Sequence, residues 1–63
     1  MIYVTIVFKS KLTGKWMTED HEFEFPQVAL RFMYAMRSKN QIIDGWRCDD
    51  PRDNEWLSRR FKL

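Results

Sequence analysis

The chain contains little of the chemistry on which enzymes and metal proteins depend. Its 63 residues include one cysteine, Cys48, one histidine, His21, and two glycines, Gly14 and Gly45. A single cysteine excludes an internal disulfide, and one cysteine with one histidine cannot make a cysteine-rich zinc site. Two distant glycines cannot form a glycine-rich phosphate loop. We therefore expect no catalytic activity, no cofactor and no metal ion.

Long apolar runs are also missing. No run approaches about 18 residues, the length that indicates a membrane-spanning helix. The apolar segment 1–8 lacks the basic start and the small-residue cleavage site of a secretory signal. An unpaired cysteine without an export signal favours a reducing compartment. These features predict a cytoplasmic protein with no membrane partner.

Aromatic residues, in contrast, are abundant. The chain carries three Trp, two Tyr and five Phe. A length of 63 residues allows one domain, 1–63, and a domain of this size buries only about 60% of the surface that its unfolded chain exposes. Each buried aromatic side chain removes about 150–250 Å² from water. We expect most of the aromatic residues to be needed for a dense core.

The charges alternate in sign along the chain. The formal net charge of +2 is too small to indicate nucleic-acid binding by itself. Lysine and arginine dominate residues 1–18, 26–41 and 56–63, whereas aspartate and glutamate dominate 19–24 and 44–55. Neighbouring elements of opposite charge would attract each other. This pattern argues against one continuous basic groove.

The first 25 residues predict a β-hairpin. Apolar residues occupy every second position from Ile2 to Phe8, and a second strand is expected from about Lys15 to Phe25. The segment between them ends in Gly14, which can adopt a positive φ in the turn. Placing Phe23 and Phe25 on the apolar face of the first strand requires three pairs, which are Ser10–Lys15, Phe8–Met17 and Ile2–Phe23.

A helix, a third strand and a short second helix are predicted to follow. Pro26 suits the first turn of a helix that ends near Lys39, with Asn40 after it. We expect its buried stripe to contain Val28, Ala29, Phe32, Met33, Ala35 and Met36. The strand should cover 41–48, with a bulge at Gly45.

The last element is a short helix that begins at Pro51. Asp49 or Asp50 can cap it, and Trp56, Leu57 and Phe61 should form its buried edge. We expect the third strand to lie beside the first and parallel to it, because a connection through a helix permits parallel pairing. The prediction is an α+β domain of order β-β-α-β-α, in which the first helix packs on the sheet.

Three groups of polar residues are candidates for chemistry. His21 could act as a general base near Glu19 or Asp20, but a partly exposed strand residue is the simpler interpretation. Cys48 should be a small buried hydrophobe, and Asp49 and Asp50 would raise its pKa. The acids of 44–55 do not have calcium-loop spacing. Helix capping explains them, although an acidic surface that binds a partner or mimics nucleic acid is an alternative.

Two surfaces are candidates for contact with a protein partner. The outer face of the hairpin carries Tyr3 and Trp16, which the second helix could cover or leave open. The first helix carries Leu30, Arg31, Tyr34 and Arg37 away from the centre of its buried stripe, where they could pack against the second helix or bind a partner. We expect a non-enzymatic protein-binding module, such as a bacteriophage or prophage modulator of a host protein, since those proteins are typically small and unexported.

Nucleic-acid binding is the alternative function. It would use cations of the hairpin and of the C-terminal helix, namely Lys9, Lys11, Lys15, Arg59, Arg60 and Lys62. The acids Asp20, Glu22 and Glu24 on the same hairpin face as Tyr3 and Trp16 would repel phosphate. A homodimer that buries apolar surface is a further option.

Overall fold

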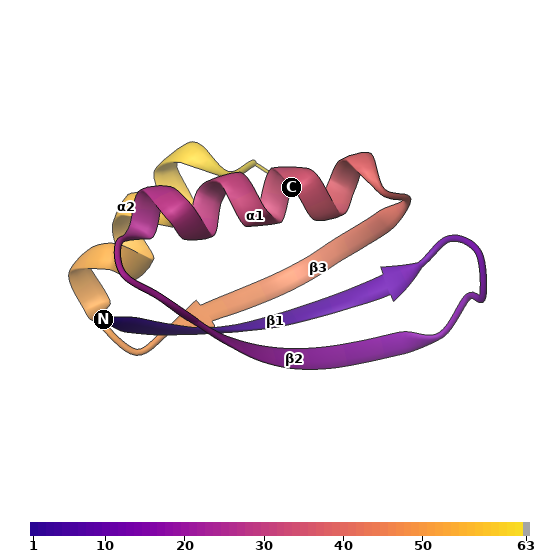
Figure 1. The fold of residues 1–63 in the computed structure, drawn as a ribbon, viewed down its shortest axis with the longest axis horizontal. Helices are drawn as coiled ribbons and strands as arrows, with labels where there is room; N and C mark the ends of the chain where they lie inside the picture. The colour runs from indigo at the N-terminus through magenta and orange to yellow at the C-terminus, as the bar shows by residue number, and fades with distance from the viewer. Residues whose placement is uncertain (63) are drawn as a thin grey trace.

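Two helices lie on one side of a three-stranded sheet in the computed structural model, which describes residues 1–62 (Figure 1). The predicted α+β class and the order β-β-α-β-α are confirmed. The elements are β1 (Ile2–Ser10), β2 (Trp16–Phe23), α1 (Pro26–Ser38), β3 (Gln41–Cys48) and α2 (Pro51–Arg60). Within residues 1–62, no helix is long and apolar enough to cross a membrane.

The hairpin has the predicted register. Ile2 pairs with Phe23 and Phe8 with Met17, and the Ser10 N–H donates to the Lys15 carbonyl at 3.2 Å. Gly14 has a φ of 71°, as the turn requires. The predicted end of the second strand was wrong, because β2 stops at Phe23.

Phe25 therefore lies outside the core, in contrast to the prediction that it shares the apolar face with Phe23. Pro26 opens α1, so Phe25 becomes the extended N-cap residue of the helix and its side chain is 60% exposed.

The third strand lies beside β1, as predicted, but it runs antiparallel to β1 and the predicted parallel pairing was wrong. Helix α1 carries the chain back along the sheet, so β3 starts at the same end as β2 and runs in the same direction (Figure 1). Since β1 lies between them and runs the opposite way, both of its neighbours are antiparallel to it. Val7 pairs with Gly45 and Phe8 with Ile43, which leaves Asp44 in the predicted bulge.

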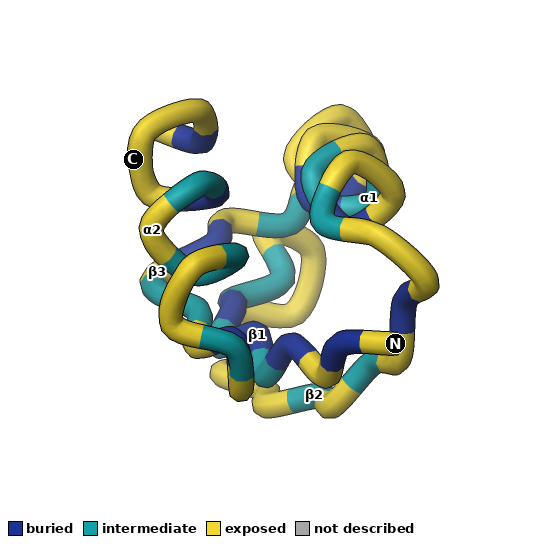
Figure 2. Tube along the Cα trace, turned by 90° about the vertical axis from the view of Figure 1, so that its left-hand side faces the viewer, coloured by how far each residue is buried: buried dark blue, intermediate teal, exposed yellow. Residues whose placement is uncertain are grey.

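The core lies between the sheet and the two helices (Figure 2). Every second residue of β1 from Ile2 to Phe8 is buried, and α1 contributes Ala29, Met33 and Met36. The predicted buried stripe of α1 was too wide, because Val28 is 44% exposed and Ala35 is also exposed. Helix α1 makes more contact with β3 than with β2, so its flank on the β2 side is left open.

Helix α2 begins with the predicted cap. The Asp50 carboxylate accepts the backbone N–H groups of Arg52 at 2.8 Å and Asp53 at 3.3 Å. Leu57 and Phe61 are fully buried, and Asn40 adopts the positive φ expected after α1. The sequence thus correctly indicated where both helices begin and where α1 ends.

Candidate functional site

The outer side of β2 is an unpaired strand edge. The sheet order is β2-β1-β3, so β1 is the only strand that pairs with β2 among residues 1–62. Antiparallel pairing turns alternate residues toward the partner strand. Because Lys15 bonds to Ser10, the odd-numbered residues that follow it face β1. The N–H and C=O groups that point away from β1 are those of Trp16, Thr18, Asp20 and Glu22.

An apolar flank of α1 stands above this edge. Val28, Phe32 and Ala35 follow one another at spacings of four and three residues, which places them on one side of the helix. Phe25 precedes them at the helix start. Val28 and Ala35 are exposed and Phe32 is half-buried. These four residues, Phe25, Val28, Phe32 and Ala35, are called the α1 flank below.

A groove lies between the C-terminal half of α1 and β2, beside the contact of Phe32 with His21. It encloses about 300 Å³ and is lined by residues of both elements and of β3, namely Glu19, Phe32, Ala35, Met36, Lys39 and Gln41. Met17 lies two residues before Glu19 on the same face of β2 and is 46% exposed. The groove therefore combines an apolar wall from α1, flanked by the polar side chains of Glu19, Lys39 and Gln41, with an adjacent strand edge whose backbone is free to bond.

His21 and Glu19 form a polar pair on the helix-facing side of β2. The His21 Nε2 lies 2.9 Å from the Glu19 Oε1, and the imidazole centroid is 4.5 Å from that of Phe32. Asp20, the other acid considered for a general base, instead accepts the Thr5 hydroxyl at 2.6 Å. His21 is half-buried, as expected, and its contact with Phe32 joins β2 to α1.

Tyr3 and Trp16 are both exposed on the opposite face of the sheet. Both helices lie on the other side, so α2 does not cover this face (Figure 2). Trp16 pairs with Lys9, whose ammonium lies 5.6 Å from the indole centroid. Tyr3 and Lys9 are about 20 Å apart along β1 at roughly 3.3 Å per residue. The two aromatic side chains therefore cannot stack on neighbouring bases.

The predicted contact residues of α1 lie toward α2. Leu30 packs against the core, and the Tyr34 hydroxyl donates to the Arg60 carbonyl at 3.0 Å. Arg37 donates to the Lys62 carbonyl at 2.7 Å, and only Arg31 of the four is not seen to engage another element. Tyr34 and Arg37 thus hold the C-terminal segment against α1.

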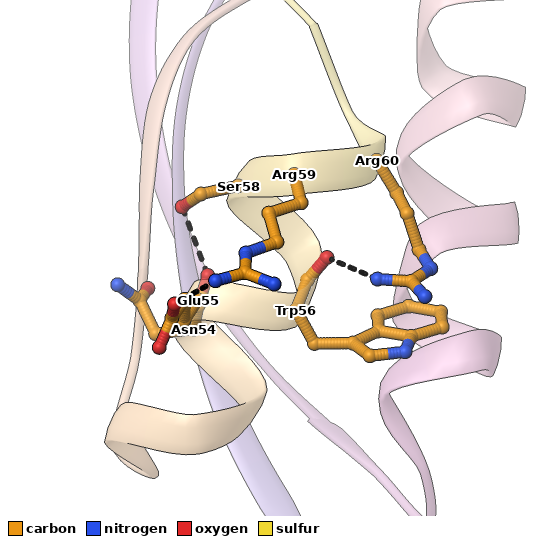
Figure 3. A network of polar contacts seen from close by, with 6 residues as sticks. All are labelled: Asn54, Glu55, Trp56, Ser58, Arg59 and Arg60. Carbon is orange, nitrogen blue, oxygen red and sulfur yellow. Dashed lines mark hydrogen bonds and ion pairs between the residues drawn. The ribbon is translucent and has the colours of Figure 1, made fainter.

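The cations considered for nucleic acid form two separate groups. Lys9, Lys11 and Lys15 surround the hairpin turn, at the end of the sheet away from the start of α2 (Figure 1). Arg59 pairs with Glu55, while the Arg60 guanidinium lies 4.0 Å from the Trp56 indole centroid and donates to the Trp56 carbonyl (Figure 3). Lys62 is exposed just beyond α2.

Cys48 is a buried thiol beside the acidic start of α2. Burial is the main cause that raises the pKa of the Cys48 thiol, and the charges of Asp49 and Asp53 add to it. The prediction for Asp50 was wrong, because its backbone N–H bonds to Cys48 and acts to lower that pKa.

The acids around Cys48 have structural partners. The Asp49 carboxylate accepts the Tyr3 N–H at 2.9 Å, and Asp50 caps α2. Over residues 1–62, no group of three or more His, Cys, Asp or Glu side chains is arranged to hold a metal ion.

Comparison with known proteins gives this chain no relative. No protein-family model matches it, and neither a curated protein nor a solved structure does. Function must therefore be argued from the residues themselves.

The groove was not predicted from the sequence, although a signal for it was present. Val28, Phe32 and Ala35 were assigned to the core together with Ala29, Met33 and Met36. Such a stripe is wider than the roughly 100° that a helix usually buries against a small core. When a helix carries more apolar residues than its core-facing side can bury, some of them must lie on an exposed surface.

Proposed function

We propose that this protein is a non-enzymatic binding module that takes an extended segment of a partner protein as a fourth strand along β2. The observation that carries the proposal is the free backbone edge of β2, which runs beside the α1 flank and the groove. Peptide capture by strand addition uses these two components, since backbone hydrogen bonds supply affinity and alternate side chains enter a pocket.

The exposed apolar surface supports this choice of site. Val28, Met17 and Phe25 are largely exposed, although all three are apolar. Met17 lies on the groove-facing side of β2, and Phe25 and Val28 belong to the α1 flank. Large apolar groups rimmed by charged residues are typical of surfaces that bind other proteins. A phage-encoded modulator would act through this site by occupying a segment that its host partner needs.

The proposal can be tested with a random peptide library. Peptides selected on the protein would be titrated against Thr18→Pro, which removes one outward N–H from β2, and against Thr18→Ala, which keeps it. Proline is tolerated on an edge strand where its missing N–H faces solvent. We expect Thr18→Pro to weaken binding by about tenfold, the equivalent of one lost backbone hydrogen bond. Thr18→Ala should bind like the unmodified protein.

A second pair of variants protects the test against a folding defect. Glu22→Pro and Glu22→Ala repeat the comparison near the end of β2, and circular dichroism would verify the fold of all four variants. The proposal fails if the library gives no binder above background. It also fails if folded Thr18→Pro and Glu22→Pro proteins bind the selected peptides as well as their alanine controls do.

Nucleic-acid binding stays a second candidate because of one face of α2. Arg52, Trp56, Arg59 and Arg60 line a hollow of about 310 Å³ on this helix, next to Glu55. Arginine can contact phosphate while tryptophan stacks on a base. Binding of single-stranded DNA or RNA by this face should weaken steeply between low and moderate salt, and Arg59→Gln with Arg60→Gln should abolish it. Absence of a shift at low salt would remove this candidate.

A further inference from the structure

We infer that the segment bound along β2 alternates apolar and basic residues, an inference that rests on the proposed strand addition. The two faces of β2 differ in chemistry, and an added strand would extend both of them. Successive side chains of a strand point to opposite faces. One set of partner side chains would therefore enter the groove, and the other set would lie beside the open face of the sheet.

The groove side selects apolar residues. Phe32, Ala35 and Met36 of α1 form its wall, and the exposed Met17 continues it along β2. Glu19, the one acid of β2 on this side, is already engaged by His21 at 2.9 Å. A Val, Ile or Leu side chain in this position would remove apolar surface of both proteins from water.

The open side selects basic residues. Asp20 and Glu22 carry the outward backbone groups of β2, and their side chains lie on the open face beside Thr5 and Tyr3. Both carboxylates are exposed, and residues 19–24 contain no lysine or arginine. Opposite charges directly across two strands stabilise the pair by about 0.2–1 kcal/mol, and like charges destabilise it. A Lys or Arg at every second position of the partner would meet these acids.

A second copy of this chain fits the edge poorly. If two β2 strands met antiparallel near the middle of the strand, residues on the same face would pair, so either Asp20 would lie opposite Asp20 of the other copy or Glu19 opposite Glu19. Each such contact sets like charges against each other. Charge complementarity thus favours a basic segment of another protein over self-pairing.

The inference can be tested with synthetic peptides of about six residues, the usual length of a strand. The probe alternates valine and lysine and has blocked ends. One comparison peptide alternates valine and glutamate, and another has the composition of the probe with its valines and lysines in separate blocks. We expect the valine–lysine peptide to bind at least about tenfold more tightly than either comparison peptide, as two favourable cross-strand pairs allow.

Charge reversal on the protein locates the interaction. Glu22→Lys should weaken binding of the valine–lysine peptide and strengthen binding of the valine–glutamate peptide. The control is Glu55→Lys, which changes net charge equally on α2, where Glu55 pairs with Arg59. An equal effect of both variants would mean that only net charge matters and would overturn the inference.

The outcome separates this inference from the proposed function. Library peptides that depend on the N–H of Thr18 but show no basic alternation would leave strand addition in place and overturn the inference. If no peptide binds, both the proposed strand addition and the inference about the alternating segment are overturned. Sedimentation that shows a dimer abolished by Thr18→Pro would assign the edge to a second copy and would also overturn it.

Discussion

The Arg37 guanidinium lies 4.3 Å from the centre of the Phe61 ring, so a residue of α1 covers the residue that ends α2. Arg37 also donates to the Lys62 carbonyl at 2.7 Å. Phe61 also packs edge-on against Trp46 of β3, with ring centroids 5.3 Å apart. These contacts hold α2 beside α1, and they explain why a helix of ten residues persists although it would be marginal in isolation.

Removal of the Phe61 ring should cost most of the stability of this small protein. Phe61→Ala is expected to lower the free energy of unfolding by about 3–5 kcal/mol, because the side chain is fully buried. Arg37→Ala should cost about 1–2 kcal/mol through the lost stacking and the lost hydrogen bond. Arg31→Ala, a change of the same kind on the exposed side of α1, should stay within about 0.5 kcal/mol. Urea unfolding monitored by tryptophan fluorescence measures all three, and equal values for Arg37→Ala and Arg31→Ala would contradict the packing role.

The cap of α2 gives a second prediction. Asp50→Ala should destabilise the protein by about 1 kcal/mol, since the Arg52 and Asp53 N–H groups lose their acceptor. Asp50→Asn should retain most of the stability because asparagine is also a good cap. Asp44→Ala removes an acid from the exposed bulge of β3 and serves as the control for charge. A loss with Asp44→Ala as large as that with Asp50→Ala would show that charge, and not capping, is responsible.

The correct and incorrect sequence predictions have different physical origins. The hairpin register follows from local facts, since the apolar faces must match and Gly14 must reach a positive φ. The direction of β3 depends on how far α1 carries the chain back along the sheet. The apolar pattern does not determine this distance. The exposure of the α1 flank could not be predicted from the sequence for a related reason. Apolar residues surround most of this helix. The position of α2 beside Tyr34 and the packing of α1 toward β3 decide which side is left uncovered.

The two glycines should respond in opposite ways to the same substitution. At neither position would an added Cβ have an atom within 4 Å, so crowding does not distinguish them. Gly14→Ala should cost about 1–2 kcal/mol because φ is 71° there. Gly45→Ala should be neutral or stabilise by up to about 1 kcal/mol, since alanine restricts the unfolded chain. Thermal unfolding of both variants provides the measurement, and a larger loss at Gly45 would mean that the bulge, not the turn, needs glycine.

The Cys48 thiol should make stability depend on alkaline pH. Its pKa is raised in the folded protein, mainly by burial, so the unfolded chain ionises first as pH increases. The folded state is therefore disfavoured progressively above roughly pH 8.5, the ordinary thiol pKa, and no such loss occurs below it. Lysines and tyrosines titrate in the same range, so the test compares the pH slope of unfolding free energy with that of Cys48→Ala. Identical slopes would contradict the prediction.

The exposed residues of the α1 flank should be dispensable for folding although they are apolar. Val28→Ala is expected to leave stability unchanged or raise it by about 0.5 kcal/mol, because Val28 is 44% exposed and alanine is the better helix former. Met33→Ala, further along the same helix but fully buried, should cost about 2–5 kcal/mol. Urea unfolding of the two variants distinguishes the flank from the core. A loss above about 1 kcal/mol for Val28→Ala would place Val28 in the core and remove the reason to assign it to a partner. Unchanged stability, combined with weaker binding of the library peptides, would instead mean that Val28 serves the groove.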